Sequence, residues 1–283
     1  MTFPGQGSSG PDHAESLAMV GHPLIGEVAE ARRRRTLRFR LTVVFVWVAI
    51  IAGVVAAIGS AGAWSWDFAL RFGPIIVLQG AGITILLSIA SVAFATVLAI
   101  LGALGRLSGN PILYGISSFY VSIIRGTPLL VQIYIIYFGL PRLGEQFILS
   151  AITAGILALS LNYGAYMTEI FRAGIQAVPR GQTEAAQALG MPEQKLFRRI
   201  VLPQAVRIVT PAIGNEFIAM LKDSDLVSTI SVHETLWLAQ RFGRRDFEPI
   251  TAFLIAALVY WALTIVFSLF QERLERRMAR SDR

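Results

Sequence analysis

The sequence predicts an all-α integral membrane protein with six transmembrane helices. Only 15% of the 283 residues are charged and 54% are hydrophobic, whereas a soluble domain carries about 25% charged residues. The hydrophobic residues also form blocks that are long enough to cross a bilayer as helices. An unusually apolar soluble enzyme would not show this block pattern, so we favour a membrane protein.

The first 63 residues predict a tail and a membrane anchor. Residues 1–40 combine a Gly-, Pro- and Ser-rich opening with a run of arginines, which indicates a disordered cytoplasmic tail with a basic anchor. The uncharged block 41–63 is long enough to be an extra N-terminal transmembrane helix. A cleaved signal peptide is the alternative, because Ala61-Gly62-Ala63 resembles a cleavage site, but the block exceeds the usual apolar region of about 7–15 residues.

Five further apolar blocks predict the remaining spans. Residues 112–124 mix apolar side chains with serines and indicate an interfacial segment that leads into the third span. Pro141 is expected to end that third span. The expected spans after the first are 77–104, 127–140, 147–171, 203–221 and 250–269.

The distribution of basic residues predicts the orientation. With the N-terminus inside, 19 of the 25 Lys and Arg residues fall in cytoplasmic segments, as the positive-inside rule expects. Both termini are then cytoplasmic, and the protein is a multi-pass protein of the inner (plasma) membrane. Cleavage of the first block would leave five spans with the same orientation.

The loop at 181–203, between the fourth and fifth spans, differs from an ordinary connector. It predicts two short helices, because the helix-forming stretch 182–189 is followed by Gly190, which can adopt the left-handed conformation that ends a helix. Two roles remain open on these residues alone. The loop is either an amphipathic segment on the membrane, or a surface for another protein formed around the small side chains of Ala185, Ala186 and Ala188.

This loop resembles the EAA loop of binding-protein-dependent ABC importer permeases, which docks in a groove of a cytoplasmic ATPase. The match comprises Glu184-Ala185-Ala186, then Gly190, Ile200 and Leu202-Pro203. Further segments are similar to the polar amino acid branch of that family, the histidine/glutamate/glutamine/arginine/opine permeases. These segments are 125–132, 161–166 with 169–175, and 215–224.

The resemblance implies a MetI-like, type I importer fold. A five-helix permease core would occupy residues 77–275, with the coupling loop at 181–203, one extra helix before it and a basic tail at 276–283. The implied partners are cytoplasmic ATP-binding subunits, a second permease subunit (identical or homologous) and an extracytoplasmic amino acid-binding protein. No Gly-x-x-x-x-Gly-Lys-Ser/Thr motif occurs, so ATP hydrolysis is expected from a separate polypeptide.

Two sets of candidate residues follow. The resemblance assigns ATPase coupling to Glu184, Ala185, Ala186, Gly190, Arg198, Leu202 and Pro203. Polar side chains at membrane depth are expensive and mark a pathway, so the candidates for a translocation path or a dimer interface are Gln132, Asn162, Tyr163, Tyr166, Glu169, Asn215, Glu216, Lys222 and Asp223. Hydrogen bonding between helices is the alternative role of Asn162 and Asn215, and Glu169 can simply pair with Arg172.

Several other classes of function are disfavoured. The chain has no cysteine and three histidines, so we expect no cofactor and no metal site. The basic residues lie between apolar blocks, which argues against a nucleic acid partner. An intramembrane enzyme would need a nucleophile–base pair that is not visible. A self-sufficient secondary amino acid transporter is the alternative function, but no convincing internal repeat of that class is present.

Overall fold

The computed structural model describes residues 23–279 and divides into two units, one ending at Trp64 and the other beginning at Ser65. Within this range the chain is helical and contains no β-strand. The α-helices are α2 (Pro23–Ser60), α3 (Trp66–Ile75), α4 (Ala81–Leu107), α5 (Pro111–Arg125), α6 (Leu129–Tyr134), α7 (Ala151–Gln176), α8 (Arg180–Ala188), α9 (Glu193–Leu196), α10 (Leu202–Asp223), α11 (Thr235–Arg245) and α12 (Pro249–Ala279).

The first unit consists of the single long helix α2. The expected disordered tail falls partly on residues 1–22, which lie outside the described residues. From Pro23 the chain is helical, so the expectation of disorder for residues 23–40 was wrong. Glu, Ala and Arg are good helix formers, and they make the basic run a continuation of the apolar helix rather than a separate tail.

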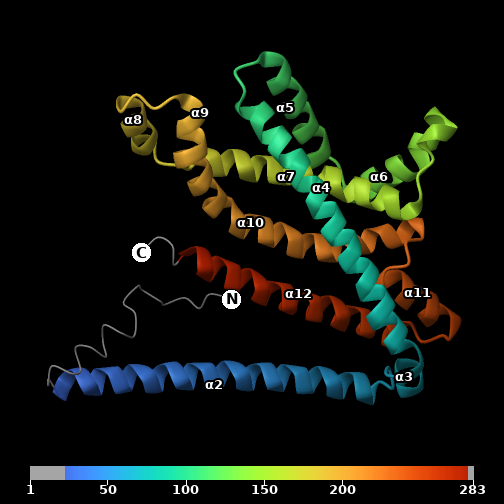
Figure 1. Ribbon diagram of the computed structural model, residues 1–283. Coiled ribbons are helices and arrows are strands. Elements are labelled where there is room, and N and C mark those ends of the chain that lie inside the picture. Colours follow the sequence, from blue (N-terminus) through green and yellow to red (C-terminus); the bar gives the residue numbers. More distant parts are fainter. Residues whose placement is uncertain (1–22, 280–283) are drawn as a thin grey trace. The chain divides into compact units, whose positions relative to one another are not determined.

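The second unit is built around helices α4 and α7. Their facing side chains are small, and Ala95, Ala99, Ala154 and Ala158 are all fully buried between them and their neighbours. Small side chains allow helix axes to approach closely, which is the main source of packing energy between helices in lipid. Helices α10 and α12 pack beside this pair (Figure 1).

The α5–α6 region forms a sharp bend rather than a straight span. The segments Pro111–Arg125 and Leu129–Leu143 meet at 107°. Three helices of the described chain are long and apolar enough to cross a membrane, namely Arg32–Ser60, Trp66–Leu107 and Pro249–Met278, and the bent pair gives up to four. The expected count of six spans is therefore not confirmed, because α7 and α10 are long enough but are not among the helices whose apolar stretches qualify as membrane spans.

The two ends of the second unit carry different elements. Figure 1 shows α8 and α9 beyond one end of α7 and α10, whereas α3 and α11 lie near the other end. The polypeptide leaves α7 at Gln176, forms α8 and α9, and returns through α10. The loop at 181–203 therefore projects from one end of the helix pair α7 and α10.

Candidate functional site

The loop at 181–203 forms the expected helix, turn and helix. Gly190 has φ +71°, and it donates its backbone N–H to the carbonyl oxygen of Gln187 at 2.9 Å. The N–H of Met191 reaches back to the carbonyl oxygen of Ala186 at 3.1 Å. This pair of hydrogen bonds around a left-handed glycine is a Schellman motif, and it fixes the direction in which the chain leaves α8.

A small hydrophobic cluster holds this loop against the ends of α7 and α10. Its buried members are Val178, Ala186, Leu196, Val201 and Ala205. Ala186 is only 3% exposed, so it packs inside the chain and is not available to a partner as part of a small-residue surface. The outward positions of α8 are instead Glu184, Ala185 and Ala188.

The remaining coupling candidates are on the surface. Arg198, Leu202 and Pro203 are exposed, and Leu202 keeps 41% of its surface accessible. Arg198 also lines a shallow hollow together with Glu193, Gln194 and Phe197. This end of the molecule thus presents a short helix, a hollow and several charges that could contact another protein.

Four of the candidates for a translocation path or dimer interface lie close together in the second unit, with one arginine beside them. The Tyr163 hydroxyl donates to Asp223 Oδ2 at 2.8 Å, and the Arg125 guanidinium lies 5.1 Å from the centre of the Tyr166 ring. Glu216 interacts electrostatically with both Asp223 and Arg125. We call Arg125, Tyr163, Tyr166, Glu216 and Asp223 the polar group; it draws on α5, α7 and α10. Lys222 is exposed next to it.

Gln132 and Asn162 have a different environment. The Gln132 amide nitrogen donates to the carbonyl oxygens of Ile124 at 2.7 Å and Thr127 at 3.1 Å, on the other side of the α5–α6 bend. Its amide oxygen accepts from Asn162 Nδ2 at 3.0 Å. Both side chains are buried. These contacts favour a structural role, in which the two amides hold the bend against α7.

Glu169 of α7 bonds to α4 near the end that carries α8 and α9. It accepts from Arg106 Nε at 3.2 Å and from Arg172 Nη2 at 2.7 Å. Arg106 also donates to Ser118 on α5 at 2.5 Å. The sequence predicted the pairing with Arg172 but missed Arg106, which ends α4 and lies 63 residues away. We call Arg106, Glu169 and Arg172 the charged clamp.

Asn215 also bonds to a neighbouring helix. Its side-chain oxygen accepts from Gln271 Nε2 of α12 at 3.0 Å, and the same Gln271 nitrogen donates to the carbonyl oxygen of Pro211 at 3.1 Å. The contact matches the interhelical role that was left open for Asn215. It ties α10 to α12.

Sequence reasoning did not find the buried carboxylate of Glu234. Its Oε1 accepts from the N–H of Trp237 at 2.8 Å, and its Oε2 accepts from the Tyr260 hydroxyl at 2.5 Å. Thr84 of α4 is a third neighbour, at 3.5 Å. Burial raises the pKa of Glu234 to about 7, and the hydrogen bond from Tyr260 opposes this shift. Only its position directly before a helix, where a side chain can cap the first turn, gives a hint in the sequence.

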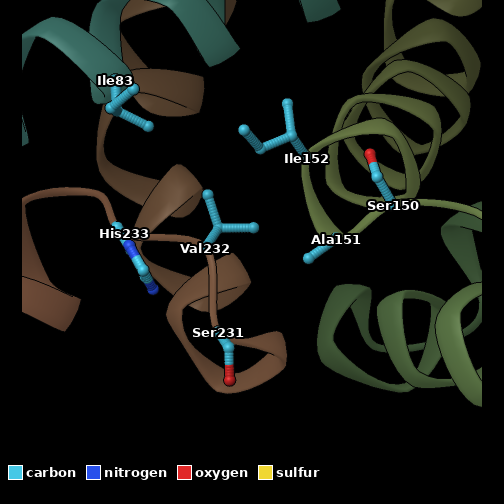
Figure 2. A pocket seen from close by; sticks show the side chains of 7 residues that line it. All are labelled: Ile83, Ser150, Ala151, Ile152, Ser231, Val232 and His233. Atoms are coloured by element: carbon cyan, nitrogen blue, oxygen red, sulfur yellow. The ribbon is translucent and has the colours of Figure 1, made fainter.

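A small pocket opens near the opposite end of the second unit, between α4, α7 and the turn before α11. In Figure 2 the side chains of Ile83, Ile152 and Val232 extend into the space between these elements. The other lining residues are Ser150, Ala151, Ser231 and His233. None of the seven is an acid, lysine or arginine, so His233 is the only ionisable side chain among these lining residues.

The described residues contain no group of three or more His, Asp or Glu side chains placed to hold a metal ion. In the charged clamp the residues that meet carry opposite charges, whereas in the polar group the carboxylates of Glu216 and Asp223 interact with each other and Glu216 also interacts with Arg125.

Comparison with known proteins agrees with this arrangement. The family described as binding-protein-dependent transport system inner membrane component matches residues 95–280. The probable amino-acid permease protein YxeN of Bacillus subtilis is 39% identical over 219 residues, which are 77% of this chain and 97% of YxeN. The L-cystine transport system permease protein TcyB of the same organism is 42% identical over 217 residues, 76% of this chain and 92% of TcyB.

Solved structures show the same fold. A chain in the crystal structure of an amino acid ABC transporter with histidines is 36% identical, with a TM-score of 0.71 over 75% of this chain and 98% of that chain. A chain of the inward-facing MetNI methionine ABC transporter is 18% identical, with a TM-score of 0.61 over 72% of this chain and 96% of that chain. The expected MetI-like fold is thus confirmed, and the chain belongs to the family of binding-protein-dependent transport system inner membrane components.

Proposed function

We propose that this chain is the transmembrane permease subunit of an ATP-binding cassette importer that carries polar amino acids across the inner membrane. The observation that carries the proposal is the loop at 181–203, held by its own hydrophobic cluster at one end of α7 and α10. The names of the relatives, which are amino acid or cystine permeases, support the substrate class. The chain itself carries out no catalysis in this proposal.

The partners follow from what the chain has and lacks. Its sequence contains no P-loop, so the energy must come from separate ATP-binding subunits. These would contact the outward face of α8, where Glu184 and Ala185 are exposed. A second permease subunit, identical or homologous, and an extracytoplasmic amino acid-binding protein complete the importer. Both chain termini are cytoplasmic in this arrangement, on the same side as the loop.

The polar group provides a reason for amino acid selectivity. A polar amino acid carries an ammonium and a carboxylate, and both need partners when water is removed. Glu216 and Asp223 can attract the ammonium, and Arg125 with the exposed Lys222 can attract the carboxylate. Tyr163 and Tyr166 supply hydroxyl groups beside them. We therefore assign these residues to the translocation path, and assign Gln132, Asn162 and Asn215 to helix packing.

The function can be tested on the assembled complex. The chain is purified through an affinity tag with its associated subunits and reconstituted in proteoliposomes, where ATP hydrolysis and uptake of labelled arginine, histidine, glutamine and glutamate are measured. Uptake that requires ATP and at least one of these amino acids is the expected result. Uptake by the chain alone, without an ATPase, would instead support a secondary transporter.

A matched pair of charge reversals tests the docking surface. Glu184→Arg on α8 should reduce recovery of the ATPase subunit with the tagged chain. Glu145→Arg, at another exposed glutamate just before the opposite end of α7, should not. Undiminished recovery with Glu184→Arg would remove α8 from the contact.

A further inference from the structure

The N-terminal unit has a feature that family membership does not explain. The alignment with YxeN takes in 97% of YxeN but only 77% of this chain, and the family match begins at residue 95. Most of the unmatched residues belong to the unit that contains α2. The side chains of this unit therefore support an inference that does not depend on the transport function.

Six arginines encircle one short section of α2. They are Arg32, Arg33, Arg34, Arg35, Arg38 and Arg40, all exposed. At about 100° per residue, their side chains point at about 0°, 100°, 200°, 300°, 240° and 80° around the helix axis. No gap between neighbouring directions is wider than about 100°, so the charges cover every face. We call these six residues the arginine collar.

The collar is followed directly by a helix of bilayer length. Leu41–Ser60 contains no charged residue, and its 20 residues rise about 30 Å, the thickness of the hydrocarbon core. Within this unit the large apolar side chains of the stretch are exposed, for example Phe45 (71%) and Val55 (62%). The collar itself extends over about 12 Å of the axis and would lie at headgroup level when the apolar stretch fills the bilayer.

We propose that the arginine collar is a binding site for anionic phospholipid headgroups of the cytoplasmic leaflet. A protein partner would contact one face of α2 and leave the other arginines unused, whereas headgroups surround a membrane helix on every side. The planar guanidinium group binds phosphate oxygens in pairs, and each basic residue near an anionic surface strengthens binding by about fivefold. The collar thus recruits a shell of anionic lipid around α2.

The test measures lipid selectivity in the full chain. The protein is placed in nanodiscs of phosphatidylcholine that contain 30% phosphatidylglycerol, and spin-labelled lipids of each type report which one occupies the protein boundary. We expect a preference for phosphatidylglycerol that weakens as salt is raised. Changing all six collar residues from Arg to Gln should lower the preference at least about threefold, whereas changing all six to Lys should retain it. Gln at Arg273, Arg276 and Arg277 of α12 is the control and should leave most of the preference intact.

Two further measurements decide between outcomes. The natural chain has no cysteine, so thiol labelling of an added Ser60→Cys shows whether α2 of the six-Gln variant still inserts into the membrane. If α2 does not insert, the salt dependence of the lipid preference in the unchanged chain is the test of the proposal. An unaltered preference in an inserted Gln variant, or a salt-independent preference in the unchanged chain, overturns the proposal. So does full displacement of phosphatidylglycerol by millimolar inorganic phosphate, which would show a site for free phosphate. Loss of ATPase subunits from the Gln variant with unchanged lipid preference would show a protein site instead.

Discussion

Replacing Gly190 tests whether the turn after α8 is held by backbone conformation alone. Gly190 has φ +71°, and a Cβ built on it meets no atom within 4 Å. Any effect of a larger residue must therefore come from the left-handed conformation, which is unfavourable for an ordinary L-residue by about 1–2 kcal/mol. A penalty of this size raises the population of the opened turn by about 5- to 30-fold.

The turn can be followed by hydrogen exchange. The N–H groups of Gly190 and Met191 are bonded in the closed turn, so Gly190→Val should speed their exchange within that range, and Gly190→Asn should have a smaller effect because Asn tolerates positive φ. Gly181→Val is the matched control, since Gly181 also has free space around it but does not have a positive φ. Equal effects at positions 181 and 190, or none at 190, would refute the conformational reasoning.

Three further predictions concern the charged clamp, the buried carboxylate and the orientation. Glu169→Gln and Arg106→Met should each lower the melting temperature. In a double-mutant cycle, the double variant should lose about 1 kcal/mol less unfolding free energy than the sum of the two single losses. Additive losses would contradict the contact. Because burial raises the pKa of Glu234 from 4.5 to about 7, the folded chain holds this proton more tightly than the unfolded chain, so stability should fall as pH rises from 5 to 7. Glu234→Gln should flatten that slope in melting curves, and an unchanged slope would assign it to other groups. Gln187→Cys, the only thiol in such a chain, should react with an impermeant maleimide in inside-out vesicles and not in right-side-out vesicles; the reverse would place the loop outside.

Local features of the loop at 181–203 were predictable because they depend on neighbouring residues. The left-handed Gly190 and the two short helices follow from turn and cap preferences. The burial of Ala186 was not predictable in this way, because the cluster that covers it also contains Val178, which lies before α8, and Ala205 of α10. A small side chain gives no indication of which neighbour covers it.

Membrane crossings were harder to predict than local turns. Apolar runs identified α2, α4 and α12, where lipid exposure demands a continuous hydrophobic surface. Helix α7 is largely buried and α10 packs against α7, α4 and α12 along one side, so the two helices can carry Asn162, Glu169 and Glu216. An interfacial segment at 112–124 before a separate third span was expected, but the angle of 107° between the two segments was not, since the Gln132 bonds that support the bend join residues on both sides of it.

Helices α7 and α10 are connected in a way that suits transmission of motion from the loop between them. Near the loop, Gly174 of α7 lies so close to Val209 of α10 that a Cβ on Gly174 would overlap the Val209 side chain. Farther along, Tyr163 bonds to Asp223, so the two helices are joined at both ends of their contact. Packed helices of this kind shift as rigid elements rather than deform. Under the proposed function we expect a force on α8 to act on both helices, and through the charged clamp on α4 and, by the Arg106–Ser118 hydrogen bond, on α5.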